Sequence, residues 1–392
     1  MKILIFMSQF FQLGGAERLQ VELALELNKR GIHTDILSMY TESLPGILDV
    51  KNNLLGRGIP DIHFLDMEIH SPLTSLFPAI LKLRRLIQKN KYDIVETSSI
   101  SPAVIATWAT LTGRTRHVSG LHQVFRRDRE NSWRHTFWRF SVRCNRHIRY
   151  YAISSYVNKA WVRYSNIAER YTRIIHNSIP DDSFNVMQYR AARQGVRREL
   201  EIPYSERIVL YVGRLAKYKG CDVLLDAVSK IMQQNNLYLL FVGMLDPAVG
   251  GSEEMLYKMK KRIKNEKLGD RVKFLGYRKD IPWLMASADV LAHPTEMEGF
   301  GLTLVEALAA GLPVVASNVE GIPEVLSGSE SIMIAPNDTQ ALQAAIIKTL
   351  NRTPEETIRV LKKGRTRAEC FREGKRVDVF INLFDDVLSG RF

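Results

Sequence analysis

Residues 298–316 read EGFGLTLVEALAAGLPVVA, a glycine-rich turn followed by a helix-forming run and a β-branched segment. The turn comes after an apolar run ending near Ala292, which predicts a strand. A turn between a strand and a helix lies at the carboxyl edge of a parallel sheet, where open α/β sheets bind ligands. Unpaired N–H groups around Gly301 and Leu302, together with the helix dipole, predict a phosphate site at this turn.

Two carboxylates flank this turn. Gly299 and Gly301 disfavour a helical conformation at Glu298, so Glu298 is expected to project from the loop, whereas Glu306 lies one turn inside the helix. This separation favours two different roles over a pair that shares one proton. The alternative for an isolated motif of this kind is an ordinary turn with two solvated charges.

Short aliphatic runs alternate with helical-period segments along the whole chain, a pattern typical of βαβ units and a parallel α/β sheet. The expected strands are Lys2–Met7, His33–Ser38, Asp93–Thr97, His117–Leu121, Tyr150–Ile153, Ile208–Val212, Tyr238–Val242, Val272–Leu275, Val290–Ala292 and Val314–Ala316. The expected helices include Ala16–Arg30, Gly220–Gln233, Gly251–Glu266, Leu302–Ala310 and Arg376–Leu388.

The length of 392 residues exceeds one ordinary hydrophobic core and predicts two domains. We place the boundary near residue 178, giving domains of 1–177 and 178–375, with a C-terminal helix at about 376–392 assigned to the first. The three cysteines show no C-x-x-C or metal-ligand spacing, which predicts a reducing cytoplasm. The apolar start is too short for a secretory signal, and no apolar run is long enough to span a bilayer.

The basic charge is concentrated in the first half of the chain. Residues 1–180 hold 25 Lys and Arg against 14 Asp and Glu, whereas residues 181–392 hold 30 against 28. The density peaks in residues 121–150, where eight arginines are interleaved with Trp133, Phe137, Trp138 and Phe140. Such a stretch suits an anionic surface such as a membrane. The alternatives are a solvated basic face or a site for a soluble anionic acceptor.

The order of the motifs resembles family 4 glycosyltransferases, retaining enzymes of the GT-B fold. Glu298 and Glu306 match the E-x7-E pattern of that family. Further matching segments are Leu13-Gly14-Gly15-Ala16-Glu17, Gly213-Arg214-Leu215 with Lys217, Lys219 and Gly220, Phe274-Leu275-Gly276-Tyr277, and Gly321-Ile322-Pro323-Glu324. Two segments depart from the family: Asn177-Ser178 replaces N-G, and Met244-Leu245-Asp246-Pro247 replaces G-x-G-P, which puts one local donor contact in doubt.

The resemblance implies two Rossmann-like domains whose parallel sheets face a central cleft, with the C-terminal helix crossing back to the first domain. It assigns acceptor binding to the first domain and nucleotide-sugar binding to the second. Implied catalytic residues are His122, Arg214, Lys219 and Glu298. Implied donor-binding residues are Gly14, Gly15, Gly213, Arg214, Lys219, Tyr277, Glu298, Gly299, Phe300, Gly301, Leu302 and Glu306.

The resemblance also implies how these side chains act. Arg214 and Lys219 would neutralise the leaving diphosphate, Glu306 would bind the ribose hydroxyls, and Glu298 would bind the transferred sugar. His122 would orient a donor hydroxyl or the acceptor, although a lone histidine after a strand is often structural. No metal or other cofactor is expected, because the two cations replace a metal and no suitable D-x-D motif occurs.

The implied function is therefore retaining hexosyl transfer from a UDP- or GDP-linked sugar to a lipid-linked glycan, in lipopolysaccharide, capsule or glycolipid assembly. The protein would be cytoplasmic and peripheral on the inner membrane face, docked through residues 121–150. One alternative is a nucleotide-sugar 2-epimerase of the same fold. Another is a nucleic-acid-binding protein, which a pI near 9.6 suggests but which lacks a recognition module.

Overall fold

A computed structural model describes residues 1–9, 15–43, 46–67, 75–122, 133–145, 147–185, 191, 193–232, 236–245 and 252–392. The chain divides into two compact units, each with its own parallel sheet. Unit 1 contains Met1–Asn177 and Gly374–Phe392, and unit 2 contains Ser178–Glu373. The C-terminal segment thus belongs to the unit formed by the N-terminal half.

Unit 1 contains a seven-stranded sheet in the order β3-β2-β1-β4-β5-β6-β7, with every pair parallel. Its strands are β1 (Lys2–Met7), β2 (His33–Tyr40), β3 (Ile62–Met67), β4 (Ile94–Thr97), β5 (Arg116–Leu121), β6 (Arg149–Ala152) and β7 (Thr172–Ile174). Residues 3–7 of β1 are buried on both faces, as expected for a central strand covered by helices on each side.

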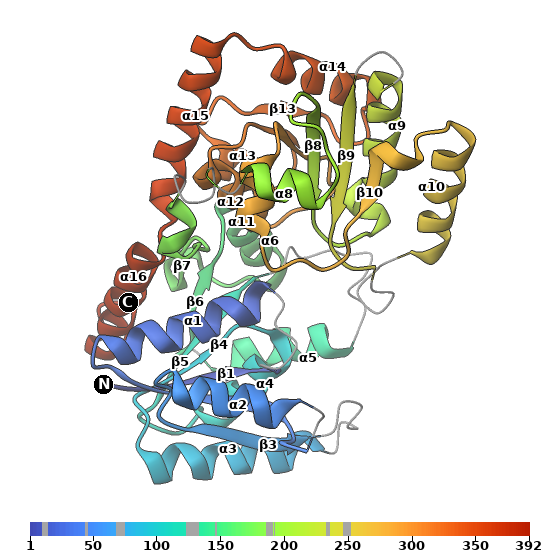
Figure 1. Cartoon of the computed structure of the whole chain (residues 1–392). Coiled ribbons are helices and arrows are strands. Elements are labelled where there is room, and N and C mark those ends of the chain that lie inside the picture. Colours follow the sequence, from blue (N-terminus) through green and yellow to red (C-terminus); the bar gives the residue numbers. More distant parts are fainter. Residues whose placement is uncertain are drawn as a thin grey trace. The chain divides into compact units, whose positions relative to one another are not determined.

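Successive residues of β1 enter different hydrophobic clusters. Ile3 and Ile5 pack with α1 (Gly15–Lys29), α2 (Ile47–Gly56) and α16 (Glu373–Ser389). Leu4 and Phe6 pack with α3 (Leu76–Asn90) and α4 (Ile100–Ala109). Figure 1 shows α16 beside α1, close to the N-terminus. The remaining α-helices among the described residues of this unit are α5 (Trp133–Cys144) and α6 (Ser155–Ser165).

Unit 2 contains a six-stranded parallel sheet in the order β10-β9-β8-β11-β12-β13. Its strands are β8 (Arg207–Val212), β9 (Leu237–Val242), β10 (Val272–Phe274), β11 (Val290–His293), β12 (Val314–Ser317) and β13 (Ile332–Ile334). Its helices are α8 (Arg193–Glu199), α9 (Cys221–Met232), α10 (Glu253–Asn265), α11 (Ile281–Ser287), α12 (Leu302–Ala310), α13 (Ile322–Leu326), α14 (Thr339–Leu350) and α15 (Pro354–Ala368).

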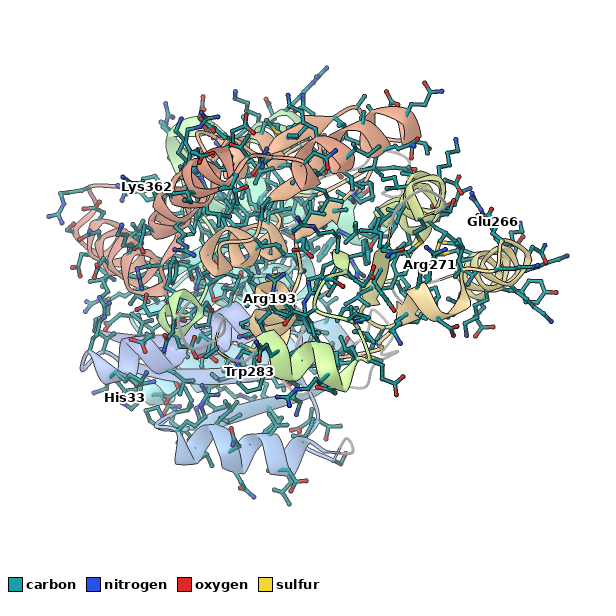
Figure 2. All side chains as sticks on the ribbon, turned by 45° about the horizontal axis from the view of Figure 1, so that its top comes forward. His33, Arg193, Glu266, Arg271, Trp283 and Lys362 are labelled. Carbon is teal, nitrogen blue, oxygen red and sulfur yellow. The ribbon has the colours of Figure 1, made fainter. Side chains whose placement is uncertain are left out.

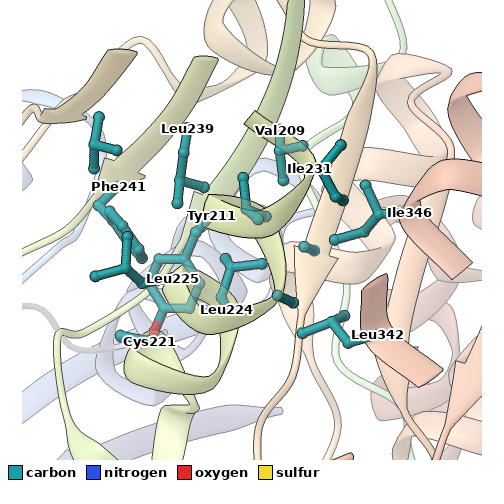
Figure 3. Close-up of a cluster of buried hydrophobic side chains, with 14 of the residues drawn as sticks. Val209, Tyr211, Cys221, Leu224, Leu225, Ile231, Leu239, Phe241, Leu342 and Ile346 are labelled. Atoms are coloured by element: carbon teal, nitrogen blue, oxygen red, sulfur yellow. The ribbon is translucent and has the colours of Figure 1, made fainter. Parts of the chain in front are cut away.

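The main core of unit 2 joins the sheet to α9, α10 and α14, and Figure 3 shows part of it. Tyr211 is fully buried there, and its ring points toward Cys221. Its hydroxyl donates a hydrogen bond of 2.8 Å to the carbonyl of Arg214. The core therefore fixes the loop that follows β8.

Three strands were not predicted: β3, β7 and β13. Each lies at the edge of its sheet, where a strand has only one neighbour. β7 and β13 have only three residues each, and β3 includes His63 and the exposed Asp66. Short or polar edge strands lack the apolar run by which a central strand is identified.

Among the described helices, none combines the length and apolarity needed to cross a bilayer.

A buried charge cluster connects α8 to the sheet of unit 2. Asp289 accepts hydrogen bonds of 3.0 Å from both Arg193, which Figure 2 labels, and Arg197, and one of 2.8 Å from the backbone N–H of Ile208. The Arg197 side chain is only 2% exposed, so this guanidinium depends on Asp289 for neutralisation. Removing one member of a buried pair leaves an uncompensated charge.

We expect Asp289→Ala to lower the free energy of unfolding by about 3 kcal/mol, because Arg197 would stay buried without its carboxylate. Urea unfolding followed by circular dichroism measures this change. Asp270→Ala, at an exposed position of the same unit, is the control and should change stability by less than about 0.5 kcal/mol. If Asp289→Ala and Asp270→Ala lowered the free energy of unfolding equally, the charge cluster would not stabilise unit 2.

Candidate functional site

The glycine turn predicted from residues 298–316 connects β11 to α12. Gly301 precedes the helix with φ of +94°, a left-handed conformation that glycine adopts without strain. α12 starts at Leu302, and the N–H groups of Leu304 and Val305 donate to the Gly301 carbonyl at 3.0 and 3.4 Å, so among its first residues the N–H groups of Leu302 and Thr303 have no acceptor within the helix. These amides and the positive end of the helix dipole form a place where an anion is stabilised.

A second loop holds the glycine turn in place. The Gly321 N–H donates to the Glu298 carbonyl at 3.0 Å, and the Glu298 N–H donates to the Glu320 carboxylate at 2.7 Å. Glu320 has φ of +49°, a conformation that costs free energy for a residue with a side chain. A Cβ atom at Gly321 would lie 2.2 Å from the Gly299 carbonyl oxygen. The two loops therefore pack backbone against backbone.

The Glu298 carboxylate binds a lysine from a neighbouring loop. Lys219 Nζ donates to Glu298 Oε2 at 2.7 Å, and His293 Nε2 lies 3.3 Å from the same oxygen. The Lys219 and Glu298 side chains are only 12% and 20% exposed. Burial opposes ionisation of Glu298, but Lys219 and His293 hold its pKa well below the usual range. Burial lowers the pKa of His293 in spite of Glu298, so the imidazole is neutral near pH 7.

The loop after β8 also brings a second cation to this site. Arg214 directly follows Gly213 and is exposed, and its guanidinium carbon lies 5.8 Å from the centre of the Tyr218 ring. Lys219 Nζ lies 5.5 Å from the same ring centre. Both distances are within the range of cation–π attraction, so the Tyr218 ring supports the two cations together.

The remaining predicted residues of unit 2 have different environments. Glu306 lies on α12, one turn beyond Leu302, and is partly buried. Phe300 is buried, and its ring packs edge-on against Phe371 at 5.4 Å between centroids, so its side chain supports the loop. Tyr277 follows β10, and its ring is 67% exposed. Glu298, Lys219, Arg214 and the start of α12 thus come together, whereas Phe300 faces the core.

In unit 1, His122 follows β5 and contacts a buried polar network. Its Nε2 lies 3.1 Å from the Tyr151 hydroxyl, which donates to Glu96 Oε1 at 2.6 Å. Gln20 donates to the same hydroxyl at 2.8 Å. Burial raises the pKa of Glu96 to about 7, while burial and the charge of Arg376 lower the pKa of His122 to about 3.

Two other predictions fall near residues whose structure is not described. Gly15 begins α1 and is exposed, whereas Gly14 lies outside the described residues. In the basic stretch 121–150, residues 123–132 and 146 also lie outside them. One aromatic residue of this stretch cannot contribute to an anionic-surface contact: Trp138 is buried against Trp161, with 4.7 Å between ring centroids.

The geometry of unit 2 suits a doubly anionic group bonded to a polar ligand. Two cations and the start of a helix can neutralise the anion, and two carboxylates can accept hydrogen bonds from hydroxyl groups. Among the residues that the structure describes, no group of three or more His, Cys, Asp and Glu side chains is arranged to hold a metal ion.

Two family models match successive parts of the chain. Residues 13–183 match Glycosyltransferase Family 4, and residues 193–367 match Glycosyl transferases group 1. Together these matches extend over most of both units. The chain belongs to glycosyltransferase family 4.

Curated relatives of this chain differ in how much of their length aligns with it. It is 33% identical over 176 residues to D-inositol 3-phosphate glycosyltransferase of Corynebacterium efficiens, a match covering 43% of this chain and 40% of that relative. The chain therefore spans about two fifths of that relative's length. It is 25% identical over 406 residues to N-acetyl-alpha-D-glucosaminyl L-malate synthase of Bacillus anthracis, covering 99% of this chain and 98% of the relative.

Solved structures show that this chain has the GT-B fold of two Rossmann-like units. A glycosyltransferase from Rickettsia africae superposes with a TM-score of 0.85 at 21% identity, covering 99% of this chain and 98% of that one. Anabaena HepE in complex with UDP-glucose superposes with a TM-score of 0.79 at 23% identity, covering 98% and 99%. At these identities the likeness establishes the fold alone.

Sequence reasoning missed several polar residues that contact the predicted ones. In unit 2 these are Tyr218, His293 and Glu320, and in unit 1 they are Gln20, Glu96 and Tyr151. Two of these residues could have been found from the sequence. His293 ends a strand, a position comparable to that of His122, which follows one. Glu320 directly precedes the Gly321-Ile322-Pro323-Glu324 motif. Glu96 and Tyr151 lie inside strands, where the sequence gives no sign that they meet.

We expect Gly321→Ala to weaken binding of a phosphate-containing ligand at this turn at least tenfold, because the added Cβ displaces the Gly299 carbonyl and with it the turn before α12. Isothermal titration with UDP and GDP measures this loss. Gly269→Ala is the matched control, since a Cβ there meets nothing within 4 Å and the backbone is compatible with alanine. Unchanged nucleotide affinity in Gly321→Ala would show that the loop contact does not shape the site.

Proposed function

We propose that this glycosyltransferase transfers a sugar from a nucleotide diphosphate sugar to an acceptor hydroxyl with retention of anomeric configuration. Unit 2 binds the donor and unit 1 binds the acceptor. The observation that carries the proposal is the Lys219–Glu298 pair, 2.7 Å apart and partly buried, in the loops beside the first turn of α12. A cation and a carboxylate placed there can contact the diphosphate and the sugar of the same donor.

The diphosphate is bound by positive groups. The Lys219 ammonium has three N–H donors, so it can hold Glu298 and a phosphate oxygen at the same time. The Arg214 guanidinium can bind phosphate in a bidentate manner, and the N–H groups at the start of α12 add further donors. Because charge builds up on the leaving diphosphate, these fixed groups lower the barrier without requiring a metal.

The carboxylates bind the polar parts of the donor. We assign Glu298 to hydroxyl groups of the transferred sugar and Glu306 to the two ribose hydroxyls. A hydrogen bond from a hydroxyl to a buried carboxylate is worth on the order of 1.5–3 kcal/mol. His122 of unit 1 is assigned to orient a donor hydroxyl or the acceptor.

The reaction exchanges one bond at the anomeric carbon for another. The acceptor oxygen forms its bond to this carbon on the face from which the diphosphate oxygen leaves, so the configuration is retained. The proton of the acceptor hydroxyl passes to the leaving phosphate oxygen. No residue is assigned as a nucleophile, and Glu298 is held as a carboxylate by Lys219 rather than poised to exchange a proton.

The donor is expected to carry UDP or GDP, and the structure of HepE with UDP-glucose supports a test of UDP donors first. Donor binding and hydrolysis across UDP-, GDP- and ADP-linked sugars identify the base and the sugar. Melting-temperature shifts provide a second test, since UDP or GDP should raise the melting temperature and single-stranded RNA should not. Release of a 2-epimer of the sugar without an acceptor would indicate the epimerase instead.

We expect Glu306→Gln to raise the dissociation constant for the nucleotide about tenfold, because the charge assistance to the ribose hydroxyls is lost. Equilibrium titration with the nucleotide measures the change. Glu254→Gln, at an exposed position on α10, is the control and should leave the constant unchanged. Unaltered affinity in Glu306→Gln would remove its ribose role while leaving the family membership intact.

The acceptor is proposed to be a lipid-linked glycan, with the enzyme docked on the inner face of the cell membrane. On α5, Phe140 is 55% exposed and Arg143 is exposed in the following turn. The Phe140 ring stacks on Trp108 of α4 at 6.2 Å between centroids, which holds it in place. An outward aromatic ring beside arginine suits the interface of an anionic bilayer.

Phe140→Asp is expected to weaken binding to vesicles containing anionic lipid roughly tenfold, because it removes the apolar contact and adds repulsion. Vesicle sedimentation at low salt measures the bound fraction. Tyr257→Asp introduces the same charge at a ring that is 67% exposed on unit 2, and should leave binding unchanged. If the wild-type protein sediments with neither anionic nor neutral vesicles, membrane docking is wrong.

A further inference from the structure

We propose that Glu96 and Tyr151 select the tautomer of His122, and so decide whether this histidine accepts a hydrogen bond from a sugar hydroxyl or donates one. The inference rests on the role given to His122 in the proposed function and specifies how that role is controlled. Glu96 and Tyr151 are positioning residues, because they act on the substrate only through the imidazole.

The sheet of unit 1 brings these side chains together across three strands. Glu96 lies on β4, Tyr151 lies on β6, and β5 runs between them. Gly120 of β5 pairs with Tyr151, and a Cβ atom there would lie 2.4 Å from the Tyr151 hydroxyl and 2.7 Å from His122 Nε2. The missing side chain leaves the space in which the phenol meets both the carboxylate and the imidazole.

The Tyr151 hydroxyl has three polar neighbours and only one proton to donate. Glu96 Oε1 lies at 2.6 Å, the Gln20 amide nitrogen at 2.8 Å and His122 Nε2 at 3.1 Å. Gln20 always donates to the phenol oxygen through its amide. The phenol proton therefore goes either to Glu96 or to His122. The Gln20 nitrogen is also 3.5 Å from Nε2, at the limit of a hydrogen bond.

Each position of the phenol proton requires one tautomer of His122. When Glu96 is ionised, the phenol donates to the carboxylate and accepts from His122, so Nε2 must carry the imidazole proton. When Glu96 is protonated, it donates to the phenol, and the phenol donates to an unprotonated Nε2. The imidazole proton is then on Nδ1.

The second ring nitrogen of His122 is the one left for a substrate. Within the part of the chain that the structure describes, Nδ1 has no hydrogen-bond partner although the atom is buried. Because buried polar atoms in folded proteins are nearly always hydrogen-bonded, we expect a bound ligand to supply the missing partner of Nδ1. Nδ1 would accept a hydrogen bond from a hydroxyl in the state with ionised Glu96 and donate one in the state with protonated Glu96.

The equilibrium between the two states lies close to neutral pH. The charged or titratable described groups that face Glu96 are Tyr151 of β6, Arg376 of α16 and, through the phenol, His122, while α1 contributes the uncharged Gln20. Burial raises the pKa of Glu96 to about 7 against the opposing effects of Tyr151 and Arg376. Since the pKa of His122 is lowered to about 3, the imidazole stays neutral and only its tautomer changes.

The decisive measurement is the ¹⁵N chemical shift of the imidazole nitrogens in the free, full-length protein, which distinguishes protonated from unprotonated ring nitrogens. His122→Asn identifies the His122 signals among those of the nine histidines. From about pH 5.5 to about pH 8.5, we expect the imidazole proton to move from Nδ1 to Nε2. A single tautomer over this whole range would overturn the proposal.

Two variants and a matched control test whether Glu96 and Tyr151 control the tautomer of His122. In Tyr151→Phe and Glu96→Gln the tautomer should no longer depend on pH. Thr97→Val removes a different buried hydrogen bond from the same strand β4, the 2.9 Å contact with His117, and should leave the pH-dependent change intact. Persistence of the change in Tyr151→Phe would overturn the proposal. If Glu96→Gln does not fold, the titration of the wild-type protein and of Tyr151→Phe still decides whether the proposal holds.

Activity measurements distinguish a failure of this inference from a failure of the proposed function. We expect Tyr151→Phe to lower kcat roughly ten- to hundredfold with little change in donor KM, and to remove the pH dependence of kcat near pH 7. Unchanged transfer by His122→Ala would reject the substrate role of His122, whatever its tautomer. A normal pH profile in Tyr151→Phe, with His122→Ala inactive, would reject the tautomer control alone.

Discussion

The contact between Lys219 and Glu298 is the interaction on which the candidate donor site depends. It exists because β8 and β11 are neighbours in a parallel sheet, so the loops that follow them emerge at the same edge. The loop after β8 carries Arg214 and Lys219, and the loop after β11 carries Glu298 and the glycine turn. The crossover order of the strands thus brings two segments, distant in sequence, into direct contact.

The same contact is more easily explained by ligand binding than by stability. A partly buried ion pair loses much of its Coulomb gain to desolvation, so it is a poor source of folding free energy. The backbone around it also carries strain, since Glu320 adopts a left-handed conformation to cap the Glu298 amide. Strain and buried charge at one sheet edge are typical of a site arranged for a ligand.

Several parts of this organisation were predictable from local patterns. Apolar runs and helical periodicity indicated the central strands, since strands covered on both faces are mostly apolar. The spacing of Glu298 and Glu306 around a glycine turn indicated one loop-projecting carboxylate and one on the helix. The edge strands β3, β7 and β13 were missed because they are short or polar. The burial of Trp138 was not predictable, because an aromatic residue in a basic stretch gives no sign of which way its ring points.

The sequence by itself determined the fold class, the family and the glycine turn, because these depend on periodicity and on residues close together in the chain. Only the tertiary structure decided that Lys219 meets Glu298, that Glu320 caps Glu298, and that Glu96, Tyr151 and His122 share one hydrogen-bonded network. These contacts depend on strand order and register, which place residues from separate βα units at hydrogen-bond distance. The order of the strands in the sheet cannot be read from the sequence of any one segment.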